Sequence, residues 1–122
     1  MMIIPLYALC ESNPQLAAKL SGSDGLKVGE FDANSFANPP YICWQIIDAD
    51  PQQYLNKNSD MDDLLVQIDV YAVSKGECRL ISKLVRQVIE DQCYIGRYTG
   101  IMQDAETKLF RISIDATWLE EP

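Results

Sequence analysis

The residues of this chain that could do chemistry are carboxylates and thiols, because the sequence contains no histidine. Acid–base catalysis usually relies on histidine or on carboxylates in an apolar cleft, and a catalytic nucleophile needs a base beside it. Cys43 and Cys78 would have no histidine as that base. Cys78 falls in the first turn of an expected helix, where the helix dipole would lower the pKa of its thiol. That single feature does not make a catalytic site, and we predict that the protein is not an enzyme.

The spacing of these groups predicts no metal site and no cofactor. Clustered carboxylates can bind hard cations, but the aspartates between residues 48 and 63 do not match an EF-hand loop. A solvated acidic loop over this range is the simpler interpretation. The four cysteines are at least fifteen residues apart, so we expect them to be free and buried in a reducing compartment. The acidic residues of the loop are Asp48, Asp50, Asp60, Asp62 and Asp63.

Length, composition and charge describe one ordinary globular domain spanning residues 1–122. The apolar fraction is 48% and the formal net charge is −8. No apolar run reaches the length of a membrane span, and the first residues lack a basic signal region, so we expect folding in the cytosol. An acidic chain repels polyanions, which disfavours nucleic-acid binding as the main activity. It is compatible with a path through which DNA slides without adhering.

Alternation of apolar and polar residues predicts the strands. Leu64–Val73 has the clearest pattern, with Val66, Ile68 and Val70 among the residues of one face and Gln67, Asp69 and Tyr71 on the other. The other expected strands are Tyr41–Ile47, Lys108–Trp118, and the weaker segments Leu26–Val28 and Gly96–Gln103, with a turn at Asp104–Thr107 before the last strand. Asp32–Pro40 and Asp48–Asp63 are predicted to be loops.

Three helices are expected. Ser74 opens the strongest one with a capping box that pairs it with Glu77, and apolar residues then recur at helical spacing to about Gln92. Two short N-terminal helices are predicted over Ile3–Glu11 and Pro14–Leu20. The fold class is therefore α+β: a mainly antiparallel sheet of about four to five strands with a long amphipathic helix (about 75–92) packed on it.

The polar face of the Leu64–Val73 strand carries more apolar area than a fully solvated face needs. Tyr71 lies on it, with Leu65 and Val73 as further apolar residues, and Gln67 and Asp69 border this stripe. Such a surface suits a subunit contact. The alternative is that the N-terminal helices, Ile3 to Leu20, cover it. Trp44 and Trp118 are expected to be core aromatics.

Several segments together resemble the tail-completion (tail-terminator) proteins of long-tailed bacteriophages. The chain has a Leu-Tyr-Ala-Leu segment at Leu6–Leu9 in its first helix and a Pro-Tyr strand at Pro39–Gln45. A Val-Gln-Ile-Asp-Val-Tyr-Ala strand at Val66–Ala72 then runs directly into an amphipathic helix. The resemblance spans about residues 3 to 92 plus the final strand, with the 66–74 segment as the best single match. Residues 100–107 depart from the pattern.

This resemblance implies a structural role in virion assembly. Such proteins cap the tail tube, typically as a hexameric ring, and form the joint to the head–tail connector. The expected partners are copies of the chain, the tube protein and the connector, with host cytoplasm and virion as locations. A ring joins two different patches of each subunit, and the candidates are the sheet edges and the acidic loop. The predicted interface residues are Leu65, Gln67, Asp69, Tyr71, Asp60, Asp62 and Asp63.

Two other interpretations remain open from the sequence. The chain could be a different phage neck component, such as a head–tail adaptor, because both are small acidic domains. It could instead be a cytosolic binding module for a peptide or a small ligand, which a deep apolar pocket with a few converging polar groups would favour.

Overall fold

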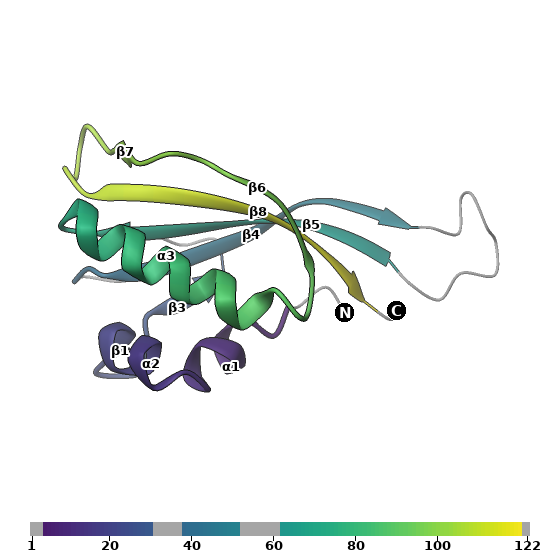
Figure 1. Cartoon of the computed structure of the whole chain (residues 1–122), viewed down its shortest axis with the longest axis horizontal. Helices are drawn as coiled ribbons and strands as arrows, with labels where there is room; N and C mark the ends of the chain where they lie inside the picture. The colour runs from purple at the N-terminus through teal and green to yellow at the C-terminus, as the bar shows by residue number, and fades with distance from the viewer. Residues whose placement is uncertain (1–3, 31–37, 52–61, 121–122) are drawn as a thin grey trace.

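A computed structural model describes residues 4–30, 38–51 and 62–120; side chains are not described for 48–51, 62–63 and 119–120. Within these ranges the chain forms three helices and a large sheet, with the helices packed on one side of the sheet (Figure 1). The α+β class with a mainly antiparallel sheet is confirmed.

The helices begin where the capping residues predict. Helix α1 spans Leu6–Glu11 and α2 spans Pro14–Leu20, with the Asn13 side chain accepting hydrogen bonds from two backbone N–H groups at the start of α2. Helix α3 spans Lys75–Ile89, and the Ser74 hydroxyl accepts from the Glu77 N–H at 3.2 Å. It ends earlier than the predicted Gln92, because the N–H groups of Gln92 and Cys93 both turn back to the carbonyl of Ile89.

The main sheet has the order β3-β4-β5-β8-β6, with β7 also paired to β8. Only β3 and β4 are parallel, and the other neighbours are antiparallel. A separate two-stranded hairpin, β1–β2, follows α2 and turns at Gly25, whose φ of 112° suits glycine. The bounds are β1 Ser21–Gly22, β2 Gly25–Leu26, β3 Val28–Glu30, β4 Tyr41–Pro51, β5 Asp62–Ala72, β6 Tyr94–Tyr98, β7 Met102–Gln103 and β8 Phe110–Glu120.

Strands β4 and β5 are longer than the sequence predicts, so the expected loop over Asp48–Asp63 is wrong at both ends. β4 continues past a bulge between Ile46 and Asp48, and its register with β5 runs on to Pro51 opposite Asp62. β8 pairs with β5 over the same stretch, as far as Asp62 opposite Glu120. Ladder pairing on both sides of β5 overrides the low strand propensity of aspartate. Residues 52–61 lie outside the described part of the chain.

Two expectations about the C-terminal half are also refined. The predicted strand Gly96–Gln103 is divided into β6 and β7, with a register shift between Ile95 and Arg97. The turn at Asp104–Thr107 is confirmed: the Asp104 carboxylate accepts hydrogen bonds from the N–H groups of Glu106 and Thr107, at 2.8 and 3.5 Å.

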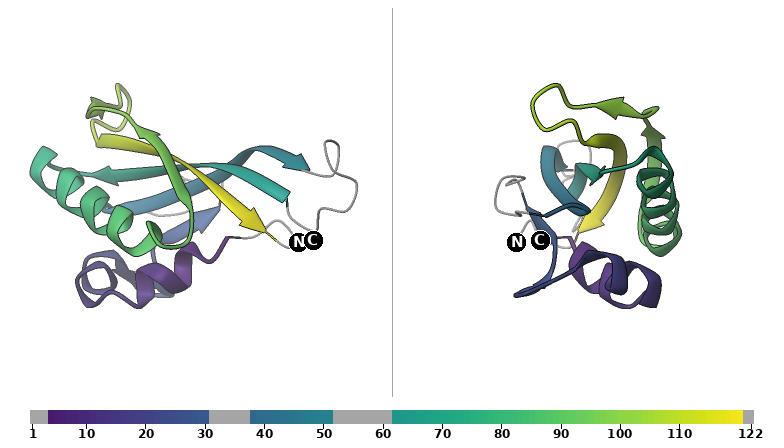
Figure 2. Two further views of the ribbon diagram at one scale, coloured as in Figure 1. Left: turned by 45° about the vertical axis from the view of Figure 1, so that its right-hand side comes forward. Right: turned by 90° about the vertical axis from the view of Figure 1, so that its left-hand side faces the viewer.

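One core lies between the sheet and all three helices. The inward residues of β5 named above are fully buried there, as are Leu6, Leu16 and Ile81 from the three helices. Trp44 and Trp118 belong to the same core, which confirms that they are packing residues. Helices α1 and α2 contact α3 and lie on its side of the sheet (Figure 2). The expectation that they cover the opposite face is therefore wrong.

Candidate interaction surfaces

The face of the sheet away from the helices, called the second face here, carries a hydrogen-bonded polar row. The register places Cys43, Asp69 and Ser113 side by side on β4, β5 and β8. The Ser113 hydroxyl donates to the Asp69 carboxylate at 2.5 Å, and the Gln67 amide donates to the same carboxylate at 3.1 Å. Asp69 and Ser113 are both buried. Asp69 therefore joins two strands of its own subunit.

An aromatic pair lies next to this polar row. Tyr41 and Tyr71 are opposed in register, and their rings stack with centroids 5.0 Å apart. With Cys43 and the partly buried Leu109 they form a small second cluster of buried residues. Burial raises the pKa of both tyrosines, although a hydrogen bond with Arg111 opposes the shift at Tyr71. Tyr71, predicted as an interface residue, packs mainly within its own subunit.

The remaining predicted interface residues fall in three places. Leu65 and Gln67 are half-exposed on the second face and can touch a neighbour. Asp62 and Asp63 are the first residues of β5, at the end where β4 and β5 extend beyond α3 (Figure 1). Asp60 lies outside the described residues. The structure does not gather these residues into one patch.

Two further exposed side chains share the second face. Tyr94 is aligned with Thr117 and, through it, with Leu65, while Met102 is aligned with Arg111 and Tyr71. Both are large hydrophobic side chains in contact with solvent, with Tyr94 72% exposed. Together with Leu65 they give this face the apolar area that a subunit contact uses.

One edge of the sheet is only partly paired. β3 pairs with β4 from Ile42 to Trp44 and no further. Among the residues that the structure describes, β4 from Gln45 to Pro51 has no strand on its outer side. An open edge strand offers a row of N–H and C=O groups to another chain. This edge is therefore a second place where a copy or a neighbour could add.

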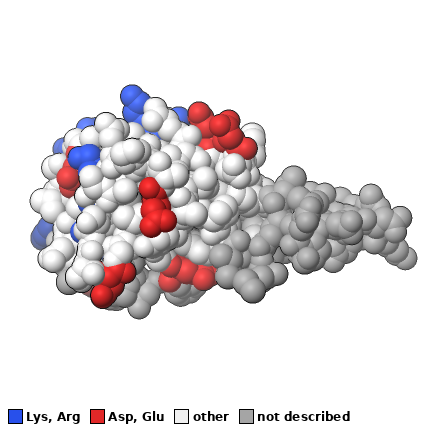
Figure 3. All heavy atoms as spheres, turned by 90° about the horizontal axis from the view of Figure 1, so that it is seen from below, with Lys and Arg blue, Asp and Glu red and all other residues white. Residues whose placement is uncertain are grey.

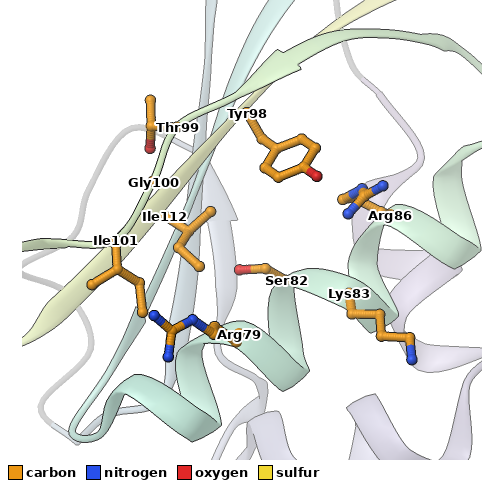
Figure 4. Close-up of a pocket in the computed structure, with 9 residues that line it drawn as sticks. All are labelled: Arg79, Ser82, Lys83, Arg86, Tyr98, Thr99, Gly100, Ile101 and Ile112. Carbon is orange, nitrogen blue, oxygen red and sulfur yellow. The ribbon is translucent and has the colours of Figure 1, made fainter.

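A cleft between α3 and the β6–β7 segment was not predicted. It has a volume of about 290 Å³ and brings three turns of the helix against the sheet edge (Figure 4). Its floor is apolar, from Ile101 and Ile112, and its rim is basic. The residues that line it are Arg79, Ser82, Lys83, Arg86, Tyr98, Thr99, Gly100, Ile101 and Ile112.

The polar groups of this cleft are incompletely paired. The Arg86 guanidinium lies over the Tyr98 ring, 4.2 Å from its centroid, which favours a fixed orientation. Its Nε is buried and has no hydrogen-bond partner, and the same holds for the hydroxyl of Ser82, a residue only 4% exposed. In Figure 4 the Ser82 side chain points into the cleft. Buried polar groups are normally satisfied, so both are candidates for contact with a ligand.

A sequence signal for this cleft exists, although its residues were interpreted as the solvated side of the helix. Lys75, Arg79, Lys83 and Arg86 recur every three or four residues, which places them on one side of α3. They are four of the ten basic residues in an otherwise acidic chain. In the view of Figure 3, basic atoms gather toward one end and acidic side chains lie in separate spots.

The thiols do not behave as the helix dipole alone would predict. Cys78 is buried with its Sγ 3.5 Å from the Val70 carbonyl, and burial raises the pKa of its thiol. Burial also raises the pKa of Cys10 to about 12 and that of Cys93 to about 11. The expected lowering at Cys78 is therefore wrong, because desolvation outweighs the dipole. Among the described residues, no group of acidic and sulfur ligands could hold a metal ion.

The buried thiols predict a loss of stability in alkali. The Cys10 pKa is raised from 9.0 to about 12, so its stabilising contribution is complete below pH 9. That contribution falls as the pH rises from 9 toward 12, because only the unfolded chain readily forms the thiolate. Urea unfolding at pH 8 and pH 10 should show a lower stability at pH 10. The decrease should be smaller in Cys10→Ala, and an equal decrease would contradict this assignment.

Comparison with known proteins decides the family. The family model of tail completion protein gp17 matches residues 4–121. The chain belongs to this family of phage tail proteins. The resemblance inferred from the sequence is confirmed, and the match includes residues 100–107, which had been left unassigned. The comparison with curated proteins gave no match.

Membership makes this tail completion protein a structural component of the phage tail, with a role in tail assembly. Its place is the virion tail, and its partners are other tail components. None of the helices in the described ranges is long and apolar enough to cross a membrane.

Proposed function

We propose that this tail completion protein ends the tail tube by closing a ring of its own copies, hexameric as the resemblance implies, over the tube end. The ring then forms the joint to the head–tail connector, after assembly in the host cytoplasm. The single observation that carries this proposal is the one-sided helical layer. With α1, α2 and α3 on one face, the second face and the outer edge of β4 remain available for other subunits.

A ring needs two different patches on each subunit, because its contacts are heterologous. The second face with Leu65, Tyr94 and Met102 is one patch of suitable chemistry. The edge of β4, or the acidic end of β4 and β5, supplies another that does not overlap it. The net charge of −8 supports passage of DNA through the ring, since like charges keep the phosphate backbone from adhering.

A substitution on the second face tests the proposal. Leu65→Arg places a charge in the proposed contact, and charges are disfavoured in the buried part of an interface. We expect binding to tail tubes to fall by about tenfold or more, a change of roughly 1.4 kcal/mol. Co-sedimentation of the protein with purified tubes measures this loss.

The matched control is Leu80→Arg, which changes an exposed leucine on α3 to the same residue. It should leave tube binding unchanged, and both variants should keep the circular dichroism spectrum of the unmodified chain. Equal tube binding by Leu65→Arg and the unmodified protein would exclude the second face from the contact.

A further inference from the structure

We propose that the cleft between α3 and β6–β7 receives the acidic ends of β4 and β5 from a second copy of this chain. This inference rests on the proposed function, because it names the contact by which neighbouring subunits join. The occupant is a carboxylate-bearing segment, supplied by Asp48, Asp50, Asp62 and Asp63 of the next subunit.

The cleft has the groups that bind a carboxylate. Arg79 and Lys83 are exposed at its rim. The Arg86 guanidinium is held over Tyr98 with its Nε buried and unpartnered. The buried Ser82 hydroxyl, also without a partner, points into the same space. A guanidinium and a hydroxyl around a cleft of about 290 Å³ suit one or two carboxylate groups.

The acidic strand ends have the opposite charge and a reason to take a partner. Segment 48–63 contains five aspartates and one lysine, a net charge of −4, whereas α3 contains four basic residues and one glutamate, a net charge of +3. The β4–β5 register places Asp50 opposite Asp63. Like charges opposed across an antiparallel pair are destabilising, and a cationic neighbour would relieve this.

The two surfaces lie in different parts of one subunit. The ends of β4 and β5 project beyond α3, while the cleft lies between the middle of α3 and the opposite edge of the sheet (Figures 1 and 4). A contact between them across copies is therefore heterologous, the type that closes rings. Charge complementarity would also set the direction in which subunits join, since cleft-to-cleft contact brings like charges together.

Paired charge reversals test the contact in the full chain. The cleft variant is Arg79→Glu with Lys83→Glu, and the strand-end variant is Asp62→Lys with Asp63→Lys. Self-association is measured by sedimentation, alone and on tail tubes. Each variant should weaken association by about tenfold or more, and the variant with all four changes should recover most of the loss because opposite charges meet again.

Matched controls separate this contact from net charge. Lys75→Glu with Lys108→Glu makes the same charge change as the cleft variant at exposed sites outside the cleft, and Glu11→Lys with Glu106→Lys matches the strand-end variant. Both controls should associate as the unmodified chain does. All variants are first checked for a native circular dichroism spectrum.

Several outcomes would overturn the inference. They are normal association of the cleft variant, failure of the fourfold variant to recover, or an unmodified chain that stays monomeric both alone and on tubes. Loss of DNA binding in the cleft variant, with normal association of the strand-end variant, would make the ligand a nucleic acid instead. If the cleft variant still caps tubes, the cleft contact is wrong and the proposed function stands. If copies associate through the cleft but never bind tubes, the proposed function is wrong and the contact stands.

Discussion

Replacing Ile68 by alanine is expected to lower the free energy of unfolding by about 2–5 kcal/mol. Ile68 is fully buried in β5, the central strand of the sheet. Its register neighbours are Trp44 on β4 and Ile114 on β8, and both face the same core. The substitution removes apolar contacts and leaves a cavity that paired strands on both sides cannot easily fill. Urea unfolding followed by tryptophan fluorescence measures the change.

Two further variants bracket this effect. Ile68→Val keeps most of the side chain and should cost only about 0.5–1.5 kcal/mol. Val73→Ala truncates a valine that is 63% exposed just after β5, and should stay within about 0.5 kcal/mol of the unmodified chain. A decrease below about 1 kcal/mol for Ile68→Ala would mean that the central strand does not anchor the core as described.

Replacing Asp69 by alanine is expected to destabilise the protein by about 1–3 kcal/mol, although the change is on the second face. The Asp69 carboxylate accepts hydrogen bonds from Ser113 and Gln67. Its removal leaves the buried Ser113 hydroxyl without this partner, and an unsatisfied buried group costs free energy. Chemical denaturation of the purified variant gives the magnitude.

A double-mutant cycle isolates the bond between Asp69 and Ser113. Asp69→Ala, Ser113→Ala and the double variant should show a coupling of about 0.5–3 kcal/mol, as expected for groups in direct contact. Effects that add within about 0.3 kcal/mol would show that the two side chains act independently. Asp69 would then be available to a neighbour, as the sequence first suggested.

The sequence predicts the elements that follow a strong local pattern. The alternation from Leu64 to Ala72 identifies β5 and its buried face, because one side of an antiparallel strand meets the core. Ser74 and Asn13 locate the starts of α3 and α2, because a capping side chain satisfies N–H groups that the helix leaves free. Both signals depend on residues within a few positions of each other, so one sequence is enough to read them.

The features that the sequence missed depend on contacts between distant segments. The aspartate-rich end of β4 has no local strand signal, and pairing with β5 extends it. Amphipathic patterning does not say which face of the sheet α1 and α2 cover. The burial of Asp69 follows from a register that brings Ser113 beside it, 44 residues away. The basic cleft likewise needs Arg86 and Tyr98 to meet across the turn after α3.

The mass of the full chain in solution, alone and mixed with purified tail tubes, tests the central claim most directly. Light scattering after size-exclusion chromatography gives that mass, and electron microscopy shows the tube ends. The account predicts that copies of the chain collect as a closed ring at the end of the tube, whatever their state when free. A chain that remains strictly monomeric and never binds a tube would contradict it.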